Sequence, residues 1–267
     1  MLLLLRLTLV PCLIALVTLA TRRWGPRVGG LLMAMPVVAG PTLVFYAIEQ
    51  GSVFAADAAA STLVGLVAVA AFCVVYAACS TRWGWPRSVV CGWLAFGVVT
   101  SGLYRMTLGP VPALVLALVA LLAARGLIDT TGVVPDGVSV PPWDLPLRMA
   151  AAATLVFVLT SLAERLGPEL SGALVPFPVA TAIIAGFTHA QAGPVAARRF
   201  LHVFIPGLCT FAVFCFVLAF ALRAVGLAAA FAAAFLVQLT LQAIILSRRP
   251  TASAAVAVAA PRARMRD

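Results

Sequence analysis

The sequence predicts an all-α protein: a polytopic transmembrane helical bundle of about nine spans in a 4+1+4 inverted-repeat arrangement. Three observations lead to this prediction: the composition, a match of the sequence to itself, and the distribution of arginine. Of the 267 residues, 64% are apolar and only 10% are charged, and the mean hydropathy is +1.13. A soluble domain of this length needs more polar surface. The apolar runs are continuous rather than alternating, which excludes transmembrane β-strands.

Each apolar run has roughly 18–22 residues, enough to cross about 30 Å of hydrocarbon as a helix. The runs place nine spans at approximately residues 2–20, 28–48, 58–80, 87–104, 108–127, 146–165, 170–190, 200–222 and 227–246. The stretch 129–144 is polar and rich in Gly, Pro and Val, and we expect it to be a connecting loop. The tail 248–267 is rich in Ala, Pro and Arg, which predicts a disordered basic segment.

The sequence matches itself without a gap when it is shifted so that Gly25 falls on Gly167, a shift that we call the repeat offset. In this register Pro26 falls on Pro168, Gly30 on Gly172, Pro36-Val37 on Pro178-Val179, Gly51 on Gly193, and Phe72-Cys73 on Phe214-Cys215. Apolar composition alone does not align Gly-Pro pairs, a helix-interior proline and loop glycines in one register. The sequence therefore indicates an internal duplication.

The duplicated unit has four predicted spans, and one span has no counterpart. Residues 1–105 form the first repeat, 106–128 the linking transmembrane helix, and 145–247 the second repeat. Because an even-numbered unit is followed by one additional helix, the second copy must enter the membrane in the opposite orientation.

The arginines test this orientation independently. All 18 basic residues are arginines, and with nine spans 14 of them fall on one side of the membrane. The other four are Arg6, Arg105, Arg165 and Arg223. The positive-inside rule then predicts a plasma (inner) membrane protein with its N-terminus outside and its C-terminus in the cytoplasm.

Inverted repeats are typical of secondary transporters, whose sites are marked by helices that Gly or Pro interrupts at equivalent positions. The second helix of each unit fits this pattern. Pro36 and Pro178 are equivalent, Gly40-Pro41 follows in one copy, and Pro176 precedes in the other. An interior proline frees a carbonyl that needs a partner in lipid, which favours a wet cavity. The alternative is a kink that only serves helix packing.

The second half also resembles the small GlpM-type membrane proteins. Their G-L-[IV]-P-x-F-P-T-like segment is matched by Gly172, Leu174, Val175 and Pro176-Phe177-Pro178, and the first half matches more loosely. Members of that family are single units, whereas this chain is doubled and has an inserted helix. The resemblance implies a link to exopolysaccharide production and suggests that single units pair antiparallel.

Polar groups within the spans are scarce, and each has two interpretations. Glu49 and His189 end the second helix of each unit, where they either load a proton or cation or lie at the wetted interface. Gln191 is the repeat equivalent of Glu49. Gln238 and Gln242 lie one turn apart on the last span, and they either hydrogen-bond between helices or line a polar pathway.

Arg6 and Arg148 are equivalent residues near helix starts. Their side chains either snorkel to the interface or attract anions at the two mouths of a pathway.

The sequence contains no phosphate-binding loop, no metal-binding histidine pair and no nucleophile motif. We therefore expect no enzyme activity, no cofactor, no metal and no nucleic-acid partner. The favoured function is a transporter, exporter or flippase of a small molecule or lipid-linked intermediate. The alternative is a non-catalytic membrane subunit of an envelope or exopolysaccharide assembly machinery. Membrane lipids are the expected surroundings, and small residues at 228–234 would allow close packing in a homo-oligomer.

Overall fold

The computed structural model of the chain describes residues 2–37, 39–103, 106, 108–135, 141–166 and 177–247. Within these residues the protein is helical and has no strand. The helices are α1 (Leu2–Trp24), α2 (Pro26–Met33), α3 (Ala39–Glu49), α4 (Ser52–Cys79), α5 (Trp85–Leu103), α6 (Pro110–Leu127), α7 (Asp144–Leu166), α9 (Val179–Ala224) and α10 (Leu227–Ser247). Four of them, α4, α6, α9 and α10, are long and apolar enough to cross a membrane. The chain is thus an all-α protein with the helices of a membrane protein.

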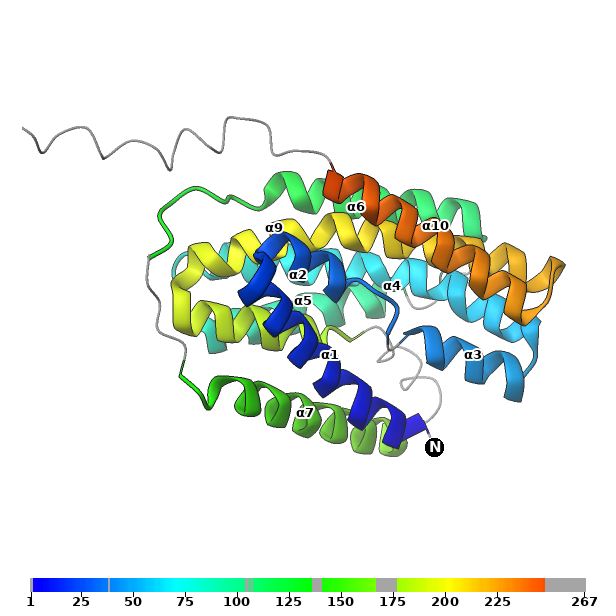
Figure 1. The fold of residues 1–267 in the computed structure, drawn as a ribbon, viewed down its shortest axis with the longest axis horizontal. Coiled ribbons are helices and arrows are strands. Elements are labelled where there is room, and N and C mark those ends of the chain that lie inside the picture. The colour runs from blue at the N-terminus through cyan, green and yellow to red at the C-terminus, as the bar shows by residue number, and fades with distance from the viewer. Residues whose placement is uncertain are drawn as a thin grey trace, which may run out of the picture.

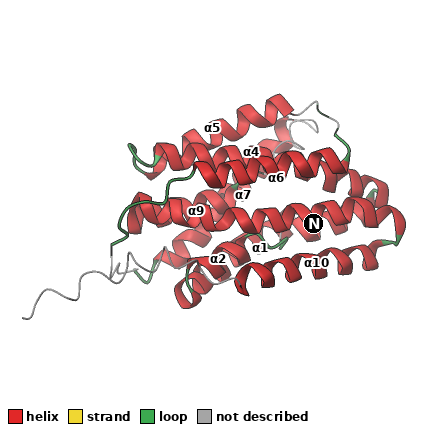
Figure 2. Cartoon of the chain, turned by 90° about the horizontal axis from the view of Figure 1, so that it is seen from above, coloured by secondary structure: helices red, strands yellow, loops and turns green. Residues whose placement is uncertain are grey.

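Helices α4 and α9 form the centre of the bundle. They pack against each other, and α4 also contacts α5 and α6, while α9 also contacts α2, α6 and α10 (Figure 1). Phe72 and Tyr76 of α4 and Phe214 of α9 are fully buried. Both helices are apolar on nearly every face, as expected of helices surrounded by other helices. Figure 2 shows α5 and α10 at opposite edges of the molecule.

Helices α1 and α7 form a separate antiparallel pair beside this centre. Arg22 near the end of α1 makes an ion pair with Asp144, the first residue of α7, at 2.5 Å. Figure 1 shows the two helices running in opposite directions. The repeat offset carries the first residue of α5 onto the first residue of α10.

The predicted span 28–48 is not one continuous helix. Helix α2 ends at Met33 and α3 begins at Ala39. Between them Ala34 donates its N–H to the carbonyl of Leu31 at 3.2 Å, a bond that tightens the last turn. Pro36 has no N–H to continue the helical ladder, which is the physical reason for the interruption.

The predicted spans 170–190 and 200–222 are two helical segments over the described residues, but a sharp turn rather than a loop of several residues joins them. The described parts of both lie in α9, which bends at Gly193 with φ 83° and ψ 174°. This backbone conformation is open essentially only to glycine, so one residue makes the turn between segments 179–192 and 194–224. Gly51, between α3 and α4, has nearly the same backbone angles, φ 92° and ψ 162°.

The remaining segment boundaries agree with the sequence patterns to within a few residues, except that α4 begins at Ser52, ahead of the predicted residue 58. The connector predicted at 129–144 ends slightly earlier, because Asp144 is the first residue of α7. The predicted disordered tail, 248–267, lies outside the described residues, as does most of the segment that leads into α9.

Candidate functional site

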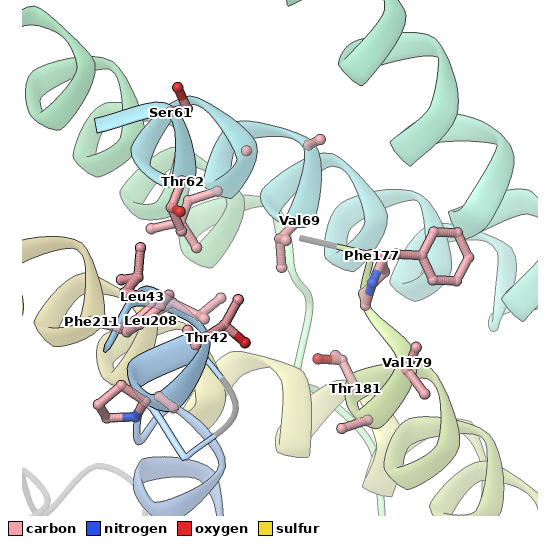
Figure 3. A pocket seen from close by; sticks show the side chains of 18 of the residues that line it. Thr42, Leu43, Ser61, Thr62, Val69, Phe177, Val179, Thr181, Leu208 and Phe211 are labelled. Carbon is pink, nitrogen blue, oxygen red and sulfur yellow. The ribbon is translucent and has the colours of Figure 1, made fainter. Parts of the chain in front are cut away.

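A cavity of about 580 Å³ lies at the centre of the bundle. Its walls come from α1, α2, α3, α4, α5, α7 and both segments of α9. Figure 3 shows lining residues of α3, α4 and α9. Leu66, near the middle of α4, and Leu208, near the middle of the segment 194–224, both line it. On α4 the lining runs from Phe54, near the start of the helix, to Val69, just past its middle, so the cavity reaches from that end of the bundle to about mid-depth.

Two helices begin at this cavity: α3, which follows the break after α2, and α9. Pro36 precedes α3 and Pro178 precedes α9, and both prolines are buried and line the cavity wall. Pro178 is the N-cap of α9, which has no side-chain cap. The proline pair predicted from the duplication therefore lies at one place in the fold.

The other predicted residues near these breaks have different surroundings. Gly40 is buried in the first turn of α3, where it donates its N–H to the Pro36 carbonyl at 2.7 Å. Pro41 is half-buried in the same turn and is not among the cavity-lining residues. Pro176 lies outside the described residues.

Hydroxyl groups supply the polar surface of the cavity. Thr42 and Thr181, in the first turns of α3 and α9, are each only 4% exposed. Figure 3 shows their hydroxyls pointing toward one another across the cavity. Thr62 donates its hydroxyl to the carbonyl of Ala58 at 2.8 Å, so its hydrogen is already used. Thr100 also lines the wall.

A buried polar cluster lies at one end of the bundle, away from the cavity. The carboxylate of Asp144 is fully buried and receives hydrogen bonds from Arg22 at 2.5 Å, from Arg148 at 2.9 Å and from Gln191. Arg148 also donates to the Gln191 side-chain oxygen at 3.0 Å and lies over the ring of Phe187, 5.0 Å from its centroid. This cluster joins the end of α1, the start of α7 and the first segment of α9.

His189 and Glu49 do not meet in the structure. His189 is 8% exposed, and its Nδ1 lies 3.3 Å from the hydroxyl of Tyr76 on α4. Glu49 is exposed at the end of α3. His189 is therefore part of the helix packing near the polar cluster, while Glu49 lies at a surface.

Gln238 and Gln242 hydrogen-bond between helices, one of the two interpretations of their spacing. Gln238 is fully buried and donates to the Ala34 carbonyl at 3.1 Å. Gln242 donates to the Leu31 carbonyl at 3.2 Å and to the Thr210 hydroxyl at 3.4 Å. These amides of α10 thus satisfy carbonyls at the end of α2, and neither side chain is among those that line the cavity.

Sequence reasoning missed Asp144, Tyr76, Thr42 and Thr181. A signal existed for Asp144, because it lies four residues before Arg148, the spacing of a helical ion pair. No comparable signal existed for the two threonines, since threonine is common in apolar helices. Their roles depend on where the interrupted helices begin.

The chain was compared with protein-family models, with curated proteins and with solved structures, and nothing matched. Over the described residues, no three His, Cys, Asp or Glu side chains come close enough to hold a metal ion.

Proposed function

We propose that this protein is a membrane transporter, exporter or flippase that carries a small molecule or lipid-linked intermediate through the central cavity. The main support for this proposal is that two helix starts, α3 after the break at Pro36 and α9 after Pro178, one in each half of the sequence, meet at a cavity that reaches the middle of the bundle. Broken helices at mid-depth are the usual setting of a transporter's substrate site.

The proposed mechanism uses two equivalent four-helix units with α6 as the linking helix. Repeated helix starts support the equivalence, since the repeat offset carries the first residue of α5 onto the first residue of α10. The same offset relates Gly51 to Gly193, which share a backbone conformation that few residues adopt. Two unrelated segments would have no reason to agree in such details.

Ion pairs between equivalent elements support an inverted relation of the units. Arg22 at the end of α1 pairs with Asp144 at the start of α7. Arg223, near the end of α9, pairs with Asp57, near the start of α4. Equivalent helices that run antiparallel are expected of units related by a two-fold axis in the membrane plane.

Alternating access then follows from exchanging the conformations of the two units. In the structure the cluster around Asp144 ties α1, α7 and α9 together at the end that we propose is cytoplasmic. The repeat equivalents of Arg148 and Gln191 are Arg6 and Glu49, so the sequence offers an Arg–Glu pair for the opposite end. We propose that these two polar groups close the pathway alternately.

Metabolite and lipid profiling tests the proposal, comparing cells that lack the gene with cells restored by wild type or by a cavity-filling variant. Ala39→Trp places an indole at the cavity wall in the first turn of α3. Leu236→Trp is the matched control, because Leu236 on α10 is 68% exposed. We expect one compound to accumulate on one side of the membrane in the deletion strain, with rescue by wild type and Leu236→Trp but not by Ala39→Trp.

The competing function is a non-catalytic subunit of an envelope or exopolysaccharide assembly machinery, which the GlpM-type resemblance favours. That function predicts a different result: the amount of envelope polymer changes, no compound shifts between compartments, and both tryptophan variants restore the polymer equally. Membrane abundance of each variant, measured by immunoblot, separates loss of transport from loss of the protein.

A further inference from the structure

The cavity also indicates which chemical class of substrate the proposed transporter takes. We propose that it binds a small organic monoanion, with a carboxylate-sized head between the first turns of α3 and α9 and an apolar body against the surrounding helices. This inference deepens the proposed function and rests on the same cavity.

The start of α9 supplies the positive potential. An α-helix start carries the equivalent of about half a positive charge, because its first N–H groups have no partner in the helix. In α3 the N–H of Gly40 already donates to the Pro36 carbonyl and Pro41 has no N–H, whereas the first segment of α9 has free amides in its first turn. The amides of Ala180 and Thr181 form no hydrogen bond within the described residues. Such amides at a helix start are suited to binding an anion.

The hydroxyl of Thr181 independently indicates a ligand at the start of α9. This side chain is buried, since only 4% of it is exposed. Its hydroxyl has no hydrogen-bond partner within the part of the chain that the structure describes. It points into the cavity toward Thr42 of the facing helix (Figure 3). The Thr181 oxygen is not one of the fully buried polar atoms that lack a partner, so it is accessible from the cavity, where an acceptor oxygen of a ligand can receive its hydrogen.

The rest of the lining decides between an anion and a cation. No Asp, Glu, Arg or His is among the described residues that line the cavity, so none of these side chains places a charge beside the helix starts. Partial charges of this size favour one negative charge and are too weak to neutralise a polyanion. The remaining wall is aliphatic and aromatic, with Leu13, Leu43 and Phe211 among its members. A volume of about 580 Å³ is within the usual range for sites that hold drug-sized molecules.

Binding to three probes of the same shape tests the proposal. The full chain in lipid nanodiscs is titrated by calorimetry with 4-phenylbutyrate, 4-phenylbutanol and 4-phenylbutylamine at neutral pH, with empty nanodiscs subtracted. We expect the carboxylate to bind about tenfold or more tightly than either the alcohol or the amine. Equal affinities, preference for the amine, or no saturable binding of the carboxylate up to about 10 mM would overturn the proposal.

Two isosteric variants locate the head group. Thr181→Val removes the unpartnered hydroxyl and is expected to weaken 4-phenylbutyrate binding about fivefold or more. Thr62→Val removes a hydroxyl of the same cavity that already donates to Ala58, so we expect less than about a twofold change. If Thr181→Val binds 4-phenylbutyrate as tightly as the wild type does, the carboxylate does not lie at Thr181. The ligand series on wild type stands even if a variant fails to fold.

The outcomes also separate this inference from the transport proposal. If the protein prefers the carboxylate but no compound shifts between compartments in cells, the anion-binding site is supported and the transport proposal is contradicted. If a compound shifts between compartments and Ala39→Trp abolishes the shift, but the carboxylate is not preferred, the transport proposal is supported and the organic-anion proposal is contradicted.

Discussion

At the scale of single residues, Asp144 is the group on which the packing of α1, α7 and α9 most depends. Its carboxylate is fully buried and is hydrogen-bonded by Arg22, Arg148 and Gln191. Asp144→Asn would leave the buried Arg148 guanidinium without a counter-charge. Removing one partner of a buried ion pair costs about 3–5 kcal/mol. We expect a loss of this order in the free energy of unfolding, measured by denaturant or thermal unfolding in detergent.

A surface pair provides the matched control for Asp144→Asn. Asp57 pairs with Arg223, and the side chains are 63% and 48% exposed. Exposed ion pairs contribute about 1 kcal/mol or less, so Asp57→Asn should leave the unfolding midpoint nearly unchanged. Equal effects of the two substitutions would show that burial of the Asp144 cluster contributes nothing to stability.

The polar residues show how far sequence reasoning reaches at this scale. Gln238 and Gln242 are recognisable from the sequence as neighbours on one helix face, and hydrogen bonding between helices is one of their two interpretations. Their acceptors are not predictable, because the carbonyls of Leu31 and Ala34 become available only where α2 ends. Thr181 is not identifiable for the same reason: its place at a helix start depends on an interruption whose position the apolar pattern does not show.

At the scale of elements, the contact of α2 with α9 depends on a glycine with no room for a side chain. A Cβ on Gly207 would lie 2.6 Å from the Cβ of Ala34. Gly207→Ala should therefore push the two helices apart and lower the free energy of unfolding by about 1–3 kcal/mol. Gly97 on α5 has nothing within 4 Å of the position that a Cβ would occupy, so Gly97→Ala should be neutral or slightly stabilising. Thermal unfolding of both variants distinguishes close packing from a general effect of glycine replacement.

The turns after α3 and within α9 give a second prediction about elements. Gly51 and Gly193 have positive φ and open space around them, so alanine there meets backbone strain but no clash. Each substitution should cost about 1–3 kcal/mol. Because the two turns have the same geometry, we expect similar losses from Gly51→Ala and Gly193→Ala in detergent unfolding. Strain at only one of the two positions would contradict their structural equivalence.

The errors in the predicted elements have one physical origin. Hydropathy identifies where apolar residues run, and the starts of α5, α6 and α10 fall close to the positions it predicts, whereas α4 begins at Ser52, ahead of the predicted residue 58. It does not reveal how tightly the chain turns between runs. Gly193 turns the chain within a single residue, and a window of apolar residues cannot separate that turn from a loop. Pro36 is recognisable as a helix breaker, yet the length of the gap from Ala34 to Ala39 depends on hydrogen bonds that form only in the folded protein.

At the scale of the whole molecule, the proposed inversion predicts that equivalent loops of the two units face opposite sides of the membrane, which cysteine labelling can test. Arg22 and Arg148, with Gln191, lie at one end of the bundle, and Asp57 and Arg223 lie at the other end, where α4 starts. The two ends are separated by the length of α4, roughly 40 Å at 1.5 Å per residue. A bilayer of about 30 Å of hydrocarbon fits between them. Charged groups at the two ends would then meet the two membrane surfaces.

Asp57 and Arg199 test the inversion directly, because the repeat offset carries one onto the other and both are exposed. Each is replaced by cysteine in a chain whose six native cysteines are changed to alanine or serine. Inverted units predict that a membrane-impermeant maleimide labels Asp57→Cys on intact cells and labels Arg199→Cys only after permeabilisation. The reason is geometric: a two-fold axis in the membrane plane carries each loop to the opposite surface. Labelling of both cysteines from the same side would mean that the units are parallel, and alternating access by exchange of their conformations would then be impossible.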